Sequence, residues 1–128
     1  MKNDFTILVL DDDPDICAML KMVLDYHGYI ATDAEDEKKA NEILSAGRVD
    51  LIIMDMLLSG TDGTDICSRL KKDHLTSSIP ILMFSAHPNA RATCLAAGAD
   101  DFISKPFEMN DMMERISFFL ERKKIGQV

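Results

Sequence analysis

The fold is decided by residues 5–15, which read FTILVLDDDPD. The first six residues are almost wholly apolar and too few for a helix, so they predict a buried β-strand. A helix start follows, because Asp13 is a good N-cap residue and Pro14 fits the first helical position. Asp11 and Asp12 lie between the two elements. The stretch therefore predicts a strand that leads through a group of acids into a helix.

The same alternation of a short apolar run and a helical pattern recurs to the end of the chain. Further strands are predicted at residues 29–32, 51–54, 81–84 and 101–104. Glycine, proline and capping residues mark the helix ends. Helices are predicted from Pro14 to Gly28, from a cap at Asp33 to Ala46, from Asp62 to Asp73, from Pro88 to Gly98, and from a cap at Asn110 to about Lys123.

These five β-α units define a fold class. Strands that are apolar throughout are buried on both faces, which is typical of a parallel sheet covered by helices on each side. Right-handed crossovers then favour an open, doubly wound α/β sheet, since a closed barrel needs eight units. The chain has 128 residues with no linker or repeat, so we expect one domain over residues 1–128 with a core at about residues 5–123.

Composition narrows the class of protein. Hydrophobic residues make up 47% and charged residues 28%, which is typical of a globular domain. A net charge of −8 disfavours direct contact with nucleic acid or an anionic membrane. The three cysteines form no C-x-x-C pair, and no stretch is suited to a signal peptide or a membrane span. We therefore expect reduced thiols, a cytoplasmic location and no membrane contact.

Chemistry is expected at the residues that directly follow the strands, because ligands of open α/β sheets bind at the carboxyl ends of the strands. These residues are Asp11, Asp12, Asp55, Ser85 and Lys105. Crowded carboxylates repel one another unless a cation neutralises them, and Mg²⁺ prefers such oxygen ligands. A carboxylate can also form an aspartyl-phosphate, whose oxygens need a metal ion and a lysine beside them. The set therefore predicts a phosphoryl-transfer site.

Four segments together resemble the response-regulator receiver domain of two-component signalling. They read LVLDDDPD, LIIMDMLLSGTDG, ILMFSAHP and DDFISKPF, and the resemblance covers roughly residues 5–123 in the order and spacing of the family. It implies a flavodoxin-like (βα)5 fold with strand order 2-1-3-4-5. It also implies a single receiver domain that acts as a phosphoprotein in a two-component system or phosphorelay.

The resemblance assigns roles to the metal and acceptor residues. Asp55 matches the phosphoacceptor and also contacts the metal ion. Asp12 matches the carboxylate that ligates Mg²⁺ or Mn²⁺, and Asp11 the one that holds the ion through water. The backbone carbonyl of Leu57 matches a further protein ligand.

The remaining roles concern signalling. Lys105 matches the lysine that pairs with the phosphoryl group, before a cis bond to Pro106. Ser85 matches the switch hydroxyl and Phe102 the switch aromatic. The implied mechanism is Mg²⁺-dependent transfer from a phosphohistidine of a sensor histidine kinase or phosphotransfer domain to Asp55. The face built from residues 88–98, 101–104 and 110–123 then repacks for a downstream protein. The domain would catalyse only its own phosphorylation and dephosphorylation.

Some positions depart from the family pattern. Ser59 stands where the family commonly has proline, which predicts a looser loop. Leu57 and His87 flank the path of the hydrolysing water in the family, so the lifetime of the phosphorylated form stays open.

Rival classes fit less well. A calcium loop starting at Asp11 would need glycine at Ile16 and glutamate at Met22. A flavodoxin loop would cradle phosphate, which three aspartates repel. A haloacid-dehalogenase phosphatase needs a second aspartate where Leu57 stands. A pseudo-receiver that binds partners without phosphorylation stays an alternative.

Partner contacts are hypotheses at this stage. Met22 lies nearly opposite the apolar stripe of the first helix and Met19 at its edge, and both are candidates for docking the phosphodonor. Phe118 is a candidate anchor for an output partner or a phosphorylation-dependent homodimer. A start at Met1 favours a natural stand-alone protein. A receiver fragment of a larger regulator or hybrid kinase stays the alternative.

Overall fold

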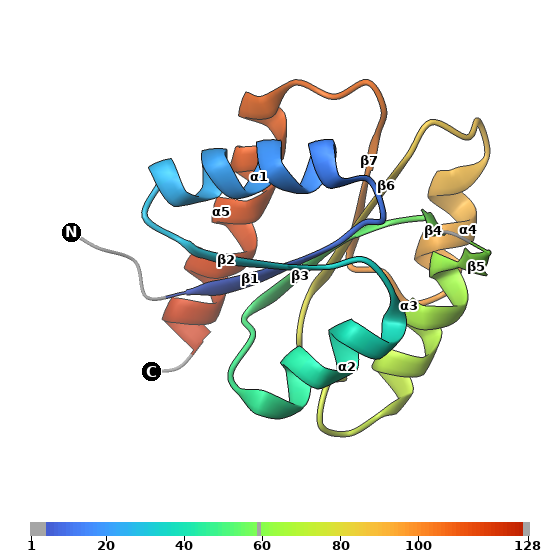
Figure 1. The fold of residues 1–128 in the computed structure, drawn as a ribbon, viewed down its shortest axis with the longest axis horizontal. Helices are drawn as coiled ribbons and strands as arrows, with labels where there is room; N and C mark the ends of the chain where they lie inside the picture. The colour runs from blue at the N-terminus through green and yellow to red at the C-terminus, as the bar shows by residue number, and fades with distance from the viewer. Residues whose placement is uncertain (1–4, 59, 127–128) are drawn as a thin grey trace.

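A five-stranded parallel sheet lies between two layers of helices (Figure 1). The computed structural model describes residues 5–58 and 60–126, with side chains as far as Glu121. The strands of the sheet, in spatial order, are β2 (Ile30–Ala34), β1 (Thr6–Leu10), β3 (Leu51–Asp55), β6 (Ile81–Ser85) and β7 (Asp101–Ser104). This is the predicted order 2-1-3-4-5, because the intervening β4 (Leu57–Leu58) and β5 (Thr61–Asp62) form a separate antiparallel pair. The predicted doubly wound α/β fold is confirmed.

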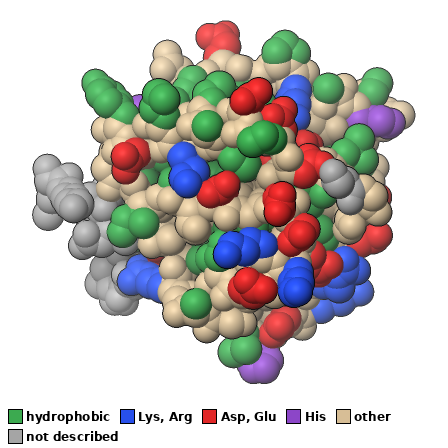
Figure 2. Space-filling view, viewed as in Figure 1, with side chains coloured by type: hydrophobic (Ala, Val, Ile, Leu, Met, Phe, Trp, Pro, Cys, Tyr) green, Lys and Arg blue, Asp and Glu red, His purple; other side chains and the backbone are tan. Residues whose placement is uncertain are grey.

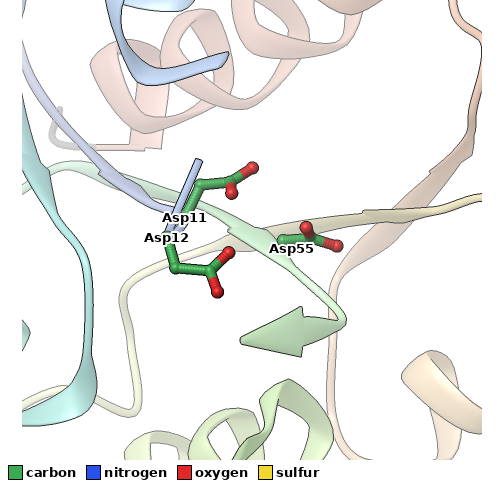
Figure 3. A group of neighbouring side chains, drawn as sticks. All are labelled: Asp11, Asp12 and Asp55. Atoms are coloured by element: carbon green, nitrogen blue, oxygen red, sulfur yellow. The ribbon is translucent and has the colours of Figure 1, made fainter. Parts of the chain in front are cut away.

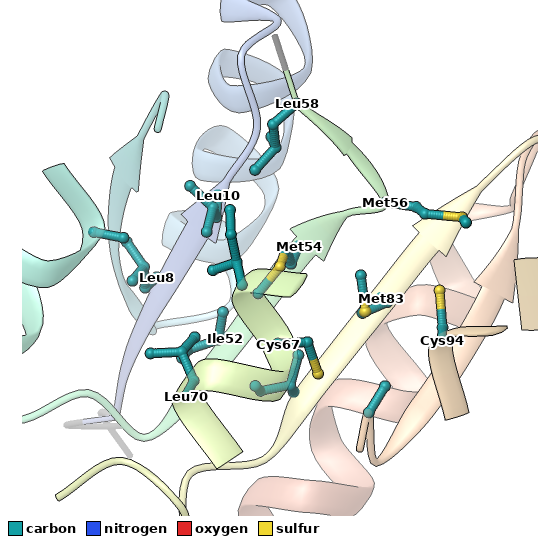
Figure 4. Close-up of a cluster of buried hydrophobic side chains, with 14 of the residues drawn as sticks. Leu8, Leu10, Ile52, Met54, Met56, Leu58, Cys67, Leu70, Met83 and Cys94 are labelled. Carbon is teal, nitrogen blue, oxygen red and sulfur yellow. The ribbon is translucent and has the colours of Figure 1, made fainter. Parts of the chain in front are cut away.

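Each face of the sheet has its own apolar cluster. On one face, β1, β3 and β6 pack against α1 (Pro14–Tyr26) and α5 (Met109–Gly126). On the other, they pack against α2 (Glu37–Ala46), α3 (Gly63–Lys72) and α4 (Ala90–Ala96). The second cluster is drawn in Figure 4, where Leu8, Ile52, Met54 and Met83 of the sheet meet Cys67 and Leu70 of α3. Burial on both faces explains why the strands read as continuous apolar runs.

Two predicted helix starts are confirmed by their caps. Asp13 is the N-cap of α1, and its side chain accepts a hydrogen bond from the Asp15 backbone N at 2.9 Å. Asp62 caps α3 and accepts from the Thr64 backbone N at 2.9 Å. These bonds satisfy donors that the first helical turn leaves without an intrahelical acceptor.

Three other helix starts were wrong by two or three residues. The N-cap of α2 is Asp36 rather than Asp33, because β2 continues to the buried Ala34 and keeps Asp33 in the strand. There Asp33 pairs with Lys21 Nζ at 3.0 Å. Helix α4 begins at Ala90, two residues after Pro88, and α5 begins at Met109 rather than after a cap at Asn110. Local capping chemistry was therefore a weaker guide than strand pairing.

The cysteines follow the prediction of reduced thiols. Cys17, Cys67 and Cys94 are buried and free of disulfide bonds. Burial raises the pKa of each thiol to about 11, so the thiols stay protonated at neutral pH. Among the described residues, no helix is both long enough and apolar enough to cross a membrane.

Candidate functional site

The strands β1, β3, β6 and β7 end on the same side of the sheet, and the predicted site residues lie there (Figure 1). Asp11 and Asp12 follow β1, Asp55 is the last residue of β3, and Ser85 is the last residue of β6. Lys105 follows β7. The parallel topology thus brings together residues up to 94 positions apart in sequence, as the carboxyl-end rule predicts.

Three carboxylates lie close together at the ends of two strands. One oxygen of each of Asp11, Asp12 and Asp55 lies within 4.8 Å of the others (Figure 3). Asp and Glu side chains also gather around this end of the molecule, on the right half of Figure 2. Like charges at this spacing repel one another unless a cation neutralises them.

Asp11 shows most clearly that the cluster suits a cation. Its side chain is 1% exposed, and burial is the main reason why its pKa rises to about 6, with the charge of Asp55 adding to the rise. Its Oδ1 accepts a hydrogen bond from the Asp13 backbone N at 2.9 Å. Its Oδ2 is the one buried side-chain polar atom in the described part of the chain that has no hydrogen-bond partner. Such an atom costs free energy unless a ligand meets it, and carboxylate oxygens are the ligands that Mg²⁺ prefers. The residues present therefore fit a divalent cation.

Lys105 brings the positive charge to this cluster. Its Nζ lies 3.3 Å from Asp55 Oδ2, and the Lys105–Pro106 peptide bond is cis, as predicted. The Lys105 backbone N donates to the Ser85 carbonyl at 2.9 Å, which ties the start of this loop to β6. Asp55 Oδ1 accepts from the Leu57 backbone N at 3.3 Å. Asp55 is therefore held between an ammonium group and two further carboxylates.

Ser85 ends β6 and Phe102 lies in β7, and within the described part of the chain neither makes a hydrogen bond to Asp55. Ser85 is 3% exposed, and its Oγ accepts from the His87 backbone N at 3.0 Å. The Phe102 side chain is buried in the α2, α3 and α4 cluster. Its carbonyl accepts from Nη1 of Arg115 at 3.0 Å and from Nη1 of Arg91 at 3.4 Å. The two predicted switch residues thus lie on neighbouring strands that also contact α4 and α5.

Comparison with known proteins decides the family. The model of the family described as "Response regulator receiver domain" matches residues 7–117. This chain belongs to the response-regulator receiver family.

Several relatives of this receiver domain are transcriptional regulators. The phosphate regulon transcriptional regulatory protein PhoB of Pseudomonas aeruginosa is 37% identical over 123 residues, which are 94% of this chain and 54% of that protein. The DNA-binding dual master transcriptional regulator RpaA of Synechocystis is 35% identical over 91% of this chain and 49% of its own length. The chain thus spans about half the length of the curated relatives it matches.

Solved structures show the same fold. A response regulator from Chloroflexus aurantiacus has a TM-score of 0.87 and 33% identity, over 93% of this chain and 99% of that one. The receiver domain of the sensor histidine kinase PA1611 from Pseudomonas aeruginosa has a TM-score of 0.83 and 25% identity, over 93% of this chain and 99% of that chain. Its crystal structure has a magnesium ion coordinated in the active site cleft.

The sequence reading missed one residue that shapes this receiver site. Gly63 begins α3, and its backbone N donates to the Met56 carbonyl at 2.6 Å. A Cβ atom at Gly63 would clash with the Asp55 carbonyl and lie 2.8 Å from the Met56 carbonyl oxygen. Only glycine lets α3 approach the backbone of Asp55 and Met56 this closely. The loop that follows Asp55 is called the acceptor loop below. The segment GTDG after an acidic strand end was the available signal.

Two predictions about the acceptor loop have different outcomes. Leu57 lies in the β4–β5 hairpin with its side chain 61% exposed, and the role of its carbonyl as a metal ligand stays a prediction. The looser loop expected at Ser59 lies outside the described residues.

Proposed function

We propose that this receiver domain accepts a phosphoryl group on Asp55 from a phosphohistidine of a sensor histidine kinase or a histidine phosphotransfer domain. The observation that carries the proposal is the setting of the Asp55 carboxylate. It ends β3 with Lys105 Nζ at 3.3 Å on one side and the Asp11 and Asp12 carboxylates within 4.8 Å on the other. This arrangement surrounds a nucleophilic oxygen with groups suited to bind a cation and a phosphoryl group.

The chemical step needs little from the protein beyond position and charge. An Asp55 carboxylate oxygen attacks the phosphorus atom, and the O–P bond forms as the N–P bond breaks. The bonding electron pair leaves with the imidazole of the donor, which takes up a proton. Lys105 neutralises charge on the transferred group, since its ammonium already lies beside Asp55. In the later hydrolysis, water attacks the same phosphorus atom, releasing inorganic phosphate and restoring the carboxylate.

A divalent cation, Mg²⁺ or Mn²⁺, belongs to this proposal. Asp11, Asp12 and Asp55 would hold it together with the backbone carbonyl of Leu57. The partnerless Oδ2 of Asp11 and the spacing of the three carboxylates support this ligand set. When bound, the ion supplies positive charge for the phosphoryl oxygens.

The signal is proposed to leave through α4, β7 and α5. Ser85 Oγ would turn from the His87 backbone N to the phosphoryl group, and Phe102 would repack with it. Arg91 of α4 and Arg115 of α5 both donate to the Phe102 carbonyl, so movement of β7 reaches both helices. The exposed Phe118 of α5 is a candidate contact for a downstream protein or a second copy. This is a shift between two packings that the new charge biases.

The wider context is proposed from the relatives. The exposed Met22 and the partly exposed Met19 of α1 are candidates for docking the phosphodonor. Because relatives about twice as long include DNA-binding regulators, an effector domain would make any nucleic-acid contact, with this acidic domain acting in the cytoplasm as its phosphorylated switch. A domain that acts alone is the other arrangement compatible with the site.

Intact-mass spectrometry after incubation with acetyl phosphate and Mg²⁺ tests the proposal. We expect one added phosphoryl group on the wild type, and none on Asp55→Asn or after chelation of the metal ion. Asp62→Asn is a matched control because asparagine keeps the cap of α3, and it should be modified like the wild type. Modification that persists in Asp55→Asn would refute the acceptor assignment. A wild type that takes no phosphoryl group and binds no beryllofluoride would indicate a pseudo-receiver.

A further inference from the structure

An aromatic ring lies directly beneath the ammonium group of Lys105. Lys105 Nζ is 4.7 Å from the centroid of the Phe84 ring and 3.3 Å from Asp55 Oδ2. Lys105 therefore has two attractive neighbours at the site, one anionic and one aromatic.

The sheet register explains why the three residues meet. Phe84 of β6 is the direct partner of Asp55 in β3, and on its other side it is the partner of Ile103 in β7. Residues paired across parallel strands point to the same face, and residues two apart along a strand do so as well. Lys105 comes two residues after Ile103. Asp55, Phe84 and Ile103 therefore form one row on the face that α1 and α5 cover, and the Lys105 ammonium group, from just beyond the end of β7, lies over the Phe84 ring.

The Phe84 ring is fixed in place. It is 0% exposed and belongs to the cluster that the sheet forms with α1 and α5. Its centroid lies 5.9 Å from that of Phe107 with the two rings at 76°, an edge-to-face contact. A ring packed in this way presents a rigid face to the lysine.

Lysine needs such a support because its side chain is long and flexible. Holding an ammonium group on a four-carbon stem in one place costs rotamer entropy. The Lys105 side chain is 29% exposed, and a partly exposed ion pair alone contributes little to holding it. An aromatic face within about 6 Å attracts an ammonium group through the ring quadrupole.

We propose that Phe84 is a positioning residue for phosphoryl transfer, and that its ring face holds the Lys105 ammonium beside Asp55. The inference rests on the proposed role of Asp55 as acceptor. An ammonium group already in position stabilises the transition state without first being ordered. Replacing the ring by an aliphatic side chain leaves Lys105 chemically intact but lets its ammonium group move into solvent.

The first test compares initial rates of phosphorylation by acetyl phosphate with Mg²⁺, measured by intact mass well below the unfolding midpoint of every variant. Phe84→Leu should be about three- to tenfold slower than the wild type, the range expected for loss of one cation–π contact. Phe119→Leu is the matched control, because Phe119 packs against the same cluster but makes its aromatic contact with Phe118 rather than with Phe84. Its rate should stay within about twofold of the wild-type rate.

A double-mutant cycle separates positioning from general damage to the core. In a Lys105→Met background, adding Phe84→Leu should change the rate by less than about twofold, since no ammonium group is left to position. A full three- to tenfold fall in that background would overturn the inference, as would an equal fall in Phe84→Leu and Phe119→Leu.

A spectroscopic measurement keeps the inference falsifiable if a variant is too unstable for kinetics. The ε-methylene protons of Lys105 in the wild type should be shifted upfield by the Phe84 ring current. Random-coil shifts for these protons would overturn the inference. If the wild type takes no phosphoryl group at Asp55 and binds no beryllofluoride, the proposed function itself fails. If it is modified and Phe84→Leu is modified equally fast, only the role of Phe84 fails.

Discussion

Two aspartates are buried at opposite ends of the sheet, and their carboxylates differ in their hydrogen-bond partners. Asp50, which precedes β3, is 0% exposed, and Asp11, which follows β1, is 1% exposed. Both oxygens of Asp50 are bonded, Oδ2 to the Thr6 backbone N at 2.8 Å and Oδ1 to Arg48 Nε at 2.7 Å. Asp11 keeps Oδ2 without a hydrogen-bond partner and lies beside two more carboxylates.

The difference separates a carboxylate whose hydrogen bonds join parts of the fold from one whose surroundings suit a ligand. At the amino end of the sheet, the charge of Asp50 joins β1 to β3 and is paired with a guanidinium group. At the carboxyl end, the charge of Asp11 is buried at a cost and faces other negative charges. Such an unfavourable buried group is typical of sites where a bound ligand offsets its free-energy cost. Burial alone would not have distinguished the two residues.

The largest effect on the free energy of unfolding is expected at Asp50, at the amino end of the sheet. Asp50→Ala leaves the Thr6 backbone N without its acceptor and Arg48 without its partner. We expect a loss of about 2–4 kcal/mol in the free energy of unfolding, because the two hydrogen bonds of the buried carboxylate are lost, whereas the Arg48 side chain is 63% exposed and its charge is taken up by solvent. Urea denaturation measures this loss. A loss below about 1 kcal/mol would show that Asp50 is not the structural carboxylate of the pair.

Gly63→Ala tests how closely α3 packs against the loop that follows Asp55, at the carboxyl end of the sheet. The added methyl group would clash with the Asp55 carbonyl, so α3 or the acceptor loop must shift. We expect a loss of roughly 1–3 kcal/mol in the free energy of unfolding together with slower phosphorylation of Asp55. Gly47→Ala is a suitable control, since a Cβ there meets no atom within 4 Å. Equal stability and equal rates in the two variants would contradict the close approach.

The pH dependence of stability sharpens the contrast between the two aspartates. The pKa of Asp11 rises from 3.8 to about 6 in the folded state, so the metal-free native protein binds more protons than the unfolded chain between pH 4 and pH 6. Its contribution to stability is therefore full below pH 4 and is lost as the pH rises to 6. At pH 7.5 without metal, Asp11→Asn should be more stable than the wild type by roughly 1–3 kcal/mol. Unfolding at a series of pH values checks this, and the difference should vanish at pH 4. A variant that is less stable at pH 7.5 would contradict the cost assigned to Asp11.

The smallest effect is expected at an exposed ion pair of the molecule. Arg69 makes two bonds of 2.7 Å to Glu37, but its side chain is 55% exposed. We expect Arg69→Gln to leave the urea midpoint of unfolding almost unchanged, because solvent screens exposed pairs. The same urea measurement applies. A loss as large as that of Asp50→Ala would mean that burial is not what separates the two cases.

The sequence predicted which side chains lie together at the carboxyl ends of the strands more accurately than it predicted where the helices begin. Asp11, Asp12, Asp55 and Lys105 were all placed together because the carboxyl ends of parallel strands must meet at one edge. Asp33 was misplaced as a cap because an aspartate suits both a cap and an exposed edge strand, and pairing between β1 and β2 decides between the two. The short β4–β5 hairpin was missed, since strands of two residues leave no periodicity.

Contacts that depend on tertiary packing could not be predicted from the local sequence pattern either. Nothing in the local pattern marks Phe84 as the ring beneath Lys105, because the contact follows from the register of β3, β6 and β7. The bonds of Arg91 and Arg115 to the Phe102 carbonyl depend in the same way on the packing of α4 and α5 beside β7. The partnerless oxygen of Asp11 is likewise a property of the folded site.

The central claim is that the carboxyl end of the sheet is built for a divalent cation, and the shift of the thermal unfolding midpoint with Mg²⁺ at pH 7.5 tests it most directly. The wild type should show a saturable rise in the midpoint. Asp11→Asn should need at least about tenfold more Mg²⁺ for the same rise. Asp13→Asn, which removes a neighbouring charge but keeps the cap of α1, should respond within about threefold of the wild type. Equal responses of all three proteins, or no response of the wild type, would contradict the account.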